Sequence, residues 1–259
     1  MSNAPEQRAT GTGSAGEDTD AGSTTEAPAA PATPPVTVKV CGITRPQDAA
    51  DALTLGVALI GVNRWEKSPR YVPDAALPAL LDAIPRGRRV FVDVAPDDAK
   101  LAAATGAGGV TPDAAAGGDF DYFQIHFDPT APDSRRRAEQ WARLAGTGRL
   151  WLAPRVAAGA PWPDWVCKIA GTVLFDGHST GMFGGTGRTA DWPRFRELRA
   201  RFPRVRWLLA GGLGPDNLAD ALRATGGDFF DLNSGIETAP GIKSAPLLAR
   251  ALATLREAR

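Results

Sequence analysis

The sequence predicts an α/β fold, a single (β/α)8 or TIM barrel preceded by a disordered N-terminal tail. Two observations predict it. Short apolar runs alternate with amphipathic segments from Val36 onward in the 259-residue chain, a pattern typical of parallel strands joined by crossover helices. Eight such units follow one another in one continuous stretch, and eight repeats in one domain favour a closed barrel over an open doubly wound sheet.

The strands are predicted where short runs are apolar and often β-branched. In chain order these runs are Val36–Val40, Leu59–Val62, Arg89–Val94, Tyr122–Ile125, Leu150–Val156, Val173–Phe175, Trp207–Ala210 and Phe229–Leu232. Amphipathic stretches after them predict the helices. These are Pro46–Leu55, Asp74–Ala83, Pro96–Ala104, Ser134–Leu144, a short helix near Trp162–Ile169, Asp191–Ala200, Pro215–Ala224 and Ala245–Arg256. The Ala/Gly-rich stretch Ala102–Gly118 is interpreted as an extended loop.

The N-terminal segment differs from the rest in composition. Residues 1–35 contain no Leu, Ile, Val, Phe, Tyr or Trp. Such a segment cannot bury enough apolar surface to offset the entropy of ordering it, so we predict a disordered tail over 1–35 and a barrel over 36–259. Five acids and one base give the tail a charge of −4. Because the whole chain has 29 basic and 29 acidic residues, the barrel carries +4 and suits a small anionic ligand.

The overall composition argues against several functional classes. A net charge of zero disfavours a general nucleic-acid binder, which would carry a basic excess. No run approaches the ~18 apolar residues that a membrane span needs, and no N-terminal secretion signal is present, so we expect a cytoplasmic protein without membrane contact. Two cysteines and two histidines are too few for a disulfide framework or a metal site built from Cys or His.

A barrel of this kind places its chemistry at the carboxyl ends of the strands, where two reactive side chains stand. Cys41 ends the first strand. Backbone N–H groups could stabilise its thiolate, which would then accept a proton, or Cys41 could be a buried packing residue. Asp176 follows the sixth strand, where it could act as a general acid or cap a loop or helix.

Glycine-containing turns follow the last two strands. Gly211 and Gly212 follow the seventh, and Asp231 ends the eighth ahead of Ser234 and Gly235. Glycines here let backbone N–H groups approach an anion, and phosphate sites in this fold form from the same two loops. We therefore predict phosphate binding, although each turn taken alone could be only a turn.

Three further features lie in the connections. The stretch Gly181–Thr189 has the wrong spacing for a phosphate-binding loop of nucleotide triphosphatases, and Arg188 stands where that loop requires Lys. We reject a nucleotide-triphosphate site and predict a lid or substrate loop. Arg70 could bind a carboxylate bidentately or be a solvated surface residue. His126 could face the barrel mouth or be a hydrogen-bonded structural residue.

Together these segments resemble the phosphoribosylanthranilate isomerase family of tryptophan biosynthesis, over nearly all of Val36–Arg256. Several motifs occur in the family's order. They are Lys39–Thr44 (KVCGIT), Lys67–Val72 (KSPRYV), Gly184–Thr189 (GGTGRT), Ala210–Leu213 (AGGL) and Asp231–Glu237 (DLNSGIE), continued by Pro240–Lys243 (PGIK).

The resemblance implies an Amadori rearrangement of N-(5′-phosphoribosyl)anthranilate to 1-(2-carboxyphenylamino)-1-deoxyribulose 5-phosphate, with no metal or organic cofactor. An acid protonates the ring oxygen and opens the sugar to an iminium, and a base removes the proton from the neighbouring carbon. Matched by motif, Cys41 would be the base, Asp176 the acid, and Arg70 the residue that holds the anthranilate carboxylate. The contacts to phosphate and ribose would come from Gly211, Gly212, Asp231, Ser234 and Gly235.

Local departures from the family pattern leave other functions open. Asn63 and Arg64 stand where the family generally has apolar and aromatic residues, and Phe127 where it usually has glycine. They lie near the expected anthranilate pocket and could alter substrate choice or only local packing. The alternatives are a diverged sugar-phosphate isomerase acting on another aminated ribose phosphate, and a non-catalytic barrel that serves as a binding module. The sequence does not distinguish a monomer from a homodimer.

Overall fold

The computed structural model describes residues 35–106, 118–176 and 191–258. The predicted tail, apart from Pro35, lies outside these ranges, as do Gly181–Thr189 and most of Ala102–Gly118. The described residues all belong to one compact unit. None of the helices in these ranges is both long enough and apolar enough to cross a lipid bilayer.

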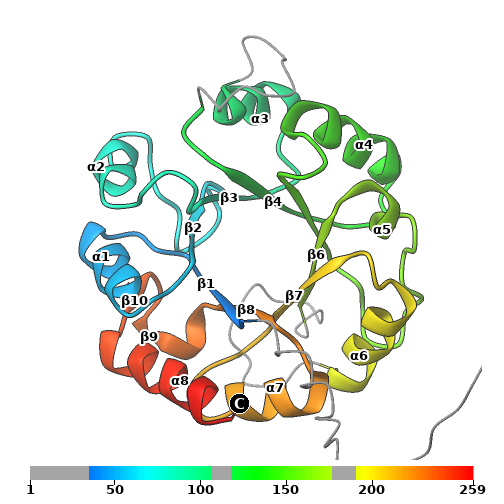
Figure 1. The fold of residues 1–259 in the computed structure, drawn as a ribbon. Coiled ribbons are helices and arrows are strands. Elements are labelled where there is room, and N and C mark those ends of the chain that lie inside the picture. Colours follow the sequence, from blue (N-terminus) through cyan, green and yellow to red (C-terminus); the bar gives the residue numbers. More distant parts are fainter. Residues whose placement is uncertain (1–34, 107–117, 177–190, 259) are drawn as a thin grey trace, which may run out of the picture. The chain divides into compact units, whose positions relative to one another are not determined.

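Eight parallel strands close into a barrel, which confirms the predicted fold (Figure 1). Each strand pairs with its neighbours in the sequence, and β8 returns to pair with β1. The strands are β1 (Thr37–Cys41), β2 (Leu59–Asn63), β3 (Arg89–Val94), β4 (Tyr122–Phe127), β5 (Leu150–Pro154), β6 (Thr172–Asp176), β7 (Arg206–Ala210) and β8 (Phe229–Leu232).

Alternation of side chains along the strands builds two apolar layers. On β3, Phe91 belongs to the larger apolar cluster, which includes the buried faces of the helices. Its neighbours Val90 and Val92 belong to a second cluster made of strand residues, which fills the barrel interior. Cys41 is part of this interior cluster. The thiol therefore stands on the face of β1 that points into the barrel, at the carboxyl end of the strand.

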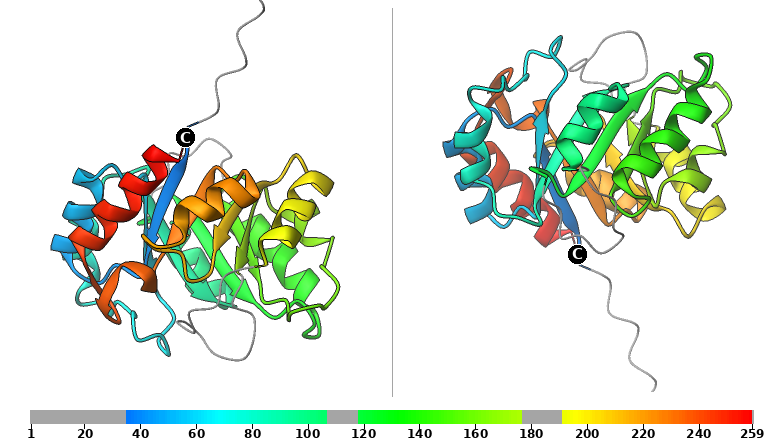
Figure 2. Two further views of the ribbon diagram at one scale, coloured as in Figure 1. Left: turned by 90° about the horizontal axis from the view of Figure 1, so that it is seen from below. Right: turned by 90° about the horizontal axis from the view of Figure 1, so that it is seen from above.

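Helices connect the strands and surround them, as the view along the barrel and the two side views show (Figures 1 and 2). Three of them begin at a side-chain cap. Asp97, Asp191 and Ser244 each accept a hydrogen bond from the backbone N–H three residues later. The helices are α1 (Pro46–Thr54), α2 (Leu77–Asp82), α3 (Asp98–Thr105), α4 (Ser134–Ala145), α5 (Val166–Ile169), α6 (Trp192–Arg201), α7 (Leu218–Thr225) and α8 (Ala245–Glu257).

Three helices begin three or more residues later than the sequence predicts, among them α7, which begins at Leu218 rather than at Pro215. α2 begins at Leu77 rather than at Asp74, and α5 begins at Val166 rather than near Trp162. Pro78 is tolerated in the first turn of α2, but in a helix that began at Asp74 its ring would clash with the Asp74 carbonyl. Asp74 therefore stays in the loop, where its carboxylate accepts a hydrogen bond from the Arg64 guanidinium. Asp74, which the sequence pattern predicts in a helix, is thus part of a tertiary contact in the loop.

Between β8 and α8 the chain forms elements that the sequence pattern did not predict. A 3-10 turn, η1 (Ser234–Ile236), leads into a two-stranded antiparallel hairpin of β9 (Glu237–Ala239) and β10 (Ile242–Lys243). Gly241 in the hairpin turn has a φ of +81°, a conformation that glycine adopts at little cost. Its carbonyl accepts a hydrogen bond from Thr44 Oγ1 at 2.6 Å. The hairpin is thereby joined to the loop that follows β1.

Candidate active site

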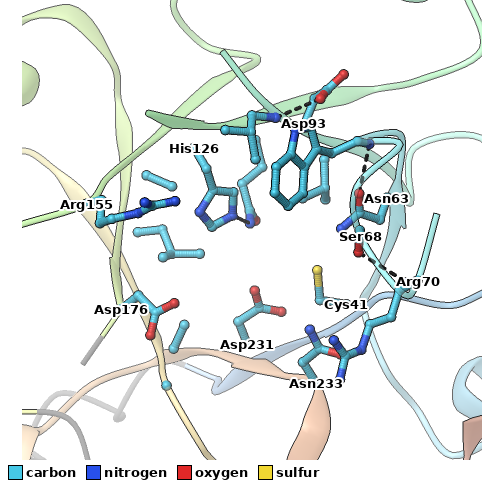
Figure 3. A pocket seen from close by; sticks show the side chains of 18 of the residues that line it. Cys41, Asn63, Ser68, Arg70, Asp93, His126, Arg155, Asp176, Asp231 and Asn233 are labelled. Atoms are coloured by element: carbon cyan, nitrogen blue, oxygen red, sulfur yellow. Dashed lines mark hydrogen bonds between the residues drawn. The ribbon is translucent and has the colours of Figure 1, made fainter. Parts of the chain in front are cut away.

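An open cavity lies at the carboxyl ends of the strands (Figure 3). This is the end of the barrel at which the fold carries its chemistry. Every strand, or the loop after it, contributes to the wall: Cys41, Asn63, Asp93, His126, Pro154, Asp176, Ala210 and Asp231 represent β1 to β8 in order. Of the eight site residues predicted from the sequence, seven line the cavity, and these are Cys41, Arg70, Asp176, Gly211, Gly212, Asp231 and Ser234.

Cys41 lies next to a buried ion pair. The Asp231 carboxylate on β8 accepts hydrogen bonds from the Lys39 ammonium on β1, at 2.8 Å to each oxygen. The Lys39 side chain is completely buried and that of Asp231 is 6% exposed. Lys39 and Cys41 are two residues apart on one strand, so their side chains point to the same face. The barrel interior thus holds a thiol, an ammonium and a carboxylate together.

Burial and charge act in opposite directions on these three groups. Burial raises the pKa of the Cys41 thiol, and the positive charge of Lys39 opposes that rise. Burial also raises the pKa of the Asp231 carboxyl, again against Lys39. For Lys39, burial acts to lower the pKa, but Asp231 and Cys41 outweigh burial and the pKa is raised. Lys39 therefore remains a full positive charge beside the thiol at neutral pH.

Arg70 reaches the cavity from the loop after β2 and is held there by Glu237. Its Nε donates to Oε1 at 2.8 Å and its Nη2 to Oε2 at 2.5 Å. Lys243 Nζ donates to the same Oε1 at 2.7 Å. Burial acts to raise the pKa of Glu237, but Arg70 and Lys243 outweigh it and the pKa is lowered. The bidentate contact uses one edge of the guanidinium, so the other edge can donate to an anion in the cavity.

The Arg70 side chain needs a glycine beneath it. Gly42 has a φ of +69°, and a Cβ built there would lie 2.4 Å from Arg70 Cδ. A side chain at this position would therefore push Arg70 away from Glu237. The Cys-Gly pair of the KVCGIT motif supplies both the thiol and the space for the arginine.

Asp176 ends β6 across the cavity from Arg70 (Figure 3). Its side chain is exposed and lines the cavity. Figure 3 shows Asp176 and Arg155 on one side, and Cys41 with Arg70 on the other. The structure thus brings the two predicted acid–base residues to one cavity, from strands on different sides of the barrel.

His126 lines the cavity at the end of β4, next to Gln124. The Nε2 atoms of the two side chains are 2.9 Å apart. Burial, assisted by the charges of Lys39 and Arg155, lowers the pKa of His126 to about 4. His126 is therefore neutral at physiological pH, and an amide N–H donating to its Nε2 leaves the ring proton on Nδ1. It both faces the cavity and is hydrogen-bonded, so the two interpretations from the sequence apply together.

The glycine turns after β7 and β8 approach each other closely. Gly211 and Gly212 have φ values of +101° and +63°, which favour glycine. Asn217 Nδ2 donates to the Gly212 carbonyl at 3.0 Å and steadies this turn. Gly235 is not in the cavity wall, but a Cβ there would lie 2.2 Å from the Leu213 carbonyl oxygen. The two turns therefore offer backbone N–H groups with no side chain in the way, as an anion site requires.

Comparison with known proteins places this arrangement in a family. A family model described as N-(5'phosphoribosyl)anthranilate (PRA) isomerase matches residues 38–253. The chain belongs to the phosphoribosylanthranilate isomerase family. An N-(5'-phosphoribosyl)anthranilate isomerase of Zymomonas mobilis is 32% identical over 228 residues, covering 85% of this chain and 98% of that protein. One from Thiobacillus denitrificans is 35% identical over 224 residues, covering 83% and 95%.

Solved structures of phosphoribosylanthranilate isomerases share the fold. The enzyme from Thermus thermophilus is 28% identical with a TM-score of 0.68, and the match covers 86% of this chain and 100% of that one. TrpF from Jonesia denitrificans is 27% identical with a TM-score of 0.64, covering 86% and 98%. These matches span the barrel from end to end, which agrees with the resemblance found in the sequence.

Two departures from the phosphoribosylanthranilate isomerase pattern lie outside the cavity wall. Phe127 is 4% exposed, and its ring contacts Trp141 and Trp165 at centroid distances of 5.7 and 5.8 Å. It therefore fills space between the barrel and the helices. Arg64 donates to the Val72 carbonyl as well as to Asp74, which ties down the loop that carries Arg70. For both residues the packing interpretation fits the structure.

Asn63 is the departure from the phosphoribosylanthranilate isomerase pattern that does border the cavity. Its Oδ1 accepts a hydrogen bond from the Trp65 backbone N–H at 2.9 Å. Trp65 lines the cavity too. The amide therefore stabilises the turn that starts the loop after β2.

The structure adds residues for which the sequence analysis assigned no role. Lys39 carried a usable signal, because a lysine within an apolar strand and two positions before Cys41 must share the cysteine's face. Glu237 and Lys243 carried none, since they lie in the short hairpin that no periodicity predicted. Asn233 carried no signal either. Its Oδ1 accepts a hydrogen bond from Lys243 Nζ at 2.8 Å, which only the structure shows.

Proposed function

We propose that this protein is a phosphoribosylanthranilate isomerase, which converts N-(5′-phosphoribosyl)anthranilate to 1-(2-carboxyphenylamino)-1-deoxyribulose 5-phosphate in tryptophan biosynthesis. One observation carries the proposal. Cys41 and Asp176 border a single cavity whose wall also contains Arg70 and the glycine turns. The relatives with 32% and 35% identity are named for the same activity, which supports it. We place the enzyme in the cytoplasm.

The proposed chemistry uses one acid and one base. Asp176 donates a proton to the ring oxygen as the bond from that oxygen to C1′ breaks, which gives an open-chain iminium. Cys41, as the thiolate, removes the proton from C2′, and the electron pair of that C–H bond forms an enolamine. Tautomerisation of the enol gives the ketone, so the product has the atoms of the substrate. No step requires a metal or an organic cofactor.

The proposed binding mode places the two anionic ends of the substrate on different elements. The outer edge of the Arg70 guanidinium binds the anthranilate carboxylate. Backbone N–H groups of Gly211, Gly212, Ser234 and Gly235 bind the phosphate. Asp231 approaches the ribose, because each carboxylate oxygen that accepts from Lys39 has a second lone pair for a hydroxyl.

A direct assay tests this function. The purified protein should convert the anthranilate substrate, and its gene should restore growth of a tryptophan auxotroph that lacks this isomerase. Cys41→Ala and Asp176→Ala should each lower turnover by at least about a hundredfold, as loss of a general acid or base does. Cys167→Ala, at the second cysteine, is the matched control. Near-normal turnover in the Cys41 or Asp176 variant would reject the role given to that residue.

The same preparation separates the alternatives. Activity on a different aminated ribose phosphate, with none on the anthranilate compound, would identify a diverged isomerase. A chain that lacks residues 1–35 should keep the kinetic constants of the full chain, because every residue of the proposed site lies within 36–259. Loss of partner binding without any catalytic activity in the full chain would instead identify a binding module.

A further inference from the structure

Lys39 is an unusual residue for the inside of a barrel. Its side chain is completely buried, and lysine is almost never fully buried unless it is paired. The Asp231 carboxylate holds the ammonium with two hydrogen bonds of 2.8 Å. An ammonium has three N–H groups, so a third remains for another acceptor.

Cys41 is the side chain in place for that further N–H. Lys39 and Cys41 point to the same face of β1, and the positive charge of Lys39 acts to lower the pKa of the Cys41 thiol against the effect of burial. Gly61 on β2, which is paired with Cys41, lies against both side chains. A Cβ built on Gly61 would lie 3.0 Å from Cys41 Sγ and 3.0 Å from Lys39 Nζ. Both atoms thus occupy the space above one glycine, and that glycine leaves room for them to meet.

The charges around Cys41 favour a thiolate. Lys39 on β1, Lys243 on β10 and Asp231 on β8 face it, and Arg70 faces it from the loop after β2. Lys243 and Arg70 share the Glu237 carboxylate. Three cations and two carboxylates leave one positive charge, which a thiolate would balance. Lys39 acts on the Cys41 thiol more strongly than Lys243 does, and Arg70 interacts with Cys41 through charge.

We propose that Lys39 is a positioning residue that makes Cys41 ionisable as the base, its ammonium stabilising the thiolate while Asp231 holds the ammonium in place. The inference rests on the role proposed for Cys41. Lys39 keeps all its protons throughout the reaction. The proton taken from the substrate goes to the sulfur.

The test measures Cys41 directly and needs no substrate. In a Cys167→Ser background, Cys41 is the sole thiol, because the chain has two cysteines. The rate of alkylation by iodoacetamide follows the thiolate fraction, so its pH midpoint reports the ionisation of Cys41. Lys39→Gln removes the positive charge but keeps an N–H donor for Asp231. Lys39→Arg keeps the charge, and Lys168→Met is a control at an exposed lysine on α5.

We expect Lys39→Gln to move the alkylation midpoint to higher pH by at least about one unit, since a nearby opposite charge shifts a pKa by 1–3 units. Turnover should fall at least tenfold in the same variant. Lys39→Arg should bring the midpoint back toward that of the parent, and Lys168→Met should leave both quantities unchanged. A folded Lys39→Gln variant with the parent's midpoint would overturn the inference, whatever its turnover.

A double variant covers the case in which Lys39→Gln does not fold. Lys39→Gln with Asp231→Asn removes both charges of the pair, so no buried carboxylate is left without a partner. Lys39 acts on Cys41 more strongly than Asp231 does, so the midpoint should still lie above that of the parent. An unchanged or lower midpoint would overturn the inference. Absence of turnover in the parent would refute the proposed function but would leave the thiol titration readable.

Discussion

Glu237→Gln is the substitution that most directly tests the charged network that holds Arg70 in the cavity wall. The carboxylate is 5% exposed at its side chain. It accepts two hydrogen bonds from Arg70, one from Lys243 and one from the Gly241 backbone N–H. Gln has the same size but no charge, and its amide nitrogen would face donors. Two buried cations would lose their shared carboxylate.

The structure gives the size of the effect. Removal of one partner from a buried ion pair costs about 3–5 kcal/mol, because the remaining charge stays desolvated. The Arg70 side chain is 11% exposed and borders the open cavity, so water reaches it and we take the lower end, about 3 kcal/mol. In a domain of this size each 1 kcal/mol moves the Tm by about 2–4 °C, so the Tm should fall by about 6–12 °C.

Thermal unfolding followed by circular dichroism measures this directly. Glu197→Gln on α6, where the side chain is exposed, is the matched control and should leave the Tm within about 1 °C. The pKa of Glu237 is lowered in the folded protein. The ionised Glu237 carboxylate therefore contributes its full stabilisation above the pKa of about 4.3 that it has in the unfolded chain. This stabilisation disappears as the pH falls through the lower pKa of the folded protein.

Parent and Glu237→Gln should accordingly differ less at pH 3 than at pH 7. Arg70 would also lose the contact that orients it, so the KM for the anthranilate substrate should rise at least tenfold while kcat falls less. A Tm within 2 °C of the parent at pH 7, or a Tm difference that does not depend on pH, would refute the reasoning.

Three other outcomes follow from the same cavity. His126, with a pKa of about 4, should stay neutral between pH 5 and 8 in an NMR titration. The stability of the fold that depends on this neutral ring is full above about pH 6.5, and it is lost as the pH falls toward the pKa of His126 in the folded protein. A titration midpoint near 6.5 would contradict this. Arg64→Ala should raise KM severalfold with little change in kcat, because the loop carrying Arg70 loses its tie to the Val72 carbonyl, and an unchanged KM would argue against that tie. Gly212→Ala should destabilise the protein by about 1–2 kcal/mol, since its φ is +63°. Gly148→Ala, with nothing within 4 Å of the added carbon, is its control in denaturant unfolding, and equal stabilities would contradict the strain argument.

Much of the site could be predicted because its residues stand at strand ends. The strand pattern placed Cys41 and Asp176 at the carboxyl ends of β1 and β6, and a closed barrel brings all such ends to one face. No pairing between distant strands had to be known. The same reasoning could have included Lys39, whose position two residues before Cys41 fixes its face.

The residues that escaped prediction depend on tertiary contacts. Glu237 and Lys243 meet across a hairpin with strands of three and two residues, which is too short to show a period. Phe127 could not be assigned to the pocket or to the packing layer until the register of β4 was known, because a shift of one residue reverses the face. Asp74 bonds to Arg64 from the loop before α2, a contact that the sequence does not show.

The pairing of β1 with β8 has a consequence for how activity is acquired. Lys39 lies directly opposite Asp231 in that pairing, although the two are 192 positions apart in the chain. They therefore meet where the first and last strands pair and close the barrel. A chain that ends before β8, or that has not yet docked it, would leave the ammonium without its carboxylate in an apolar interior. The thiolate proposed for Cys41 would therefore form only in a closed barrel, and turnover would report that the barrel is complete.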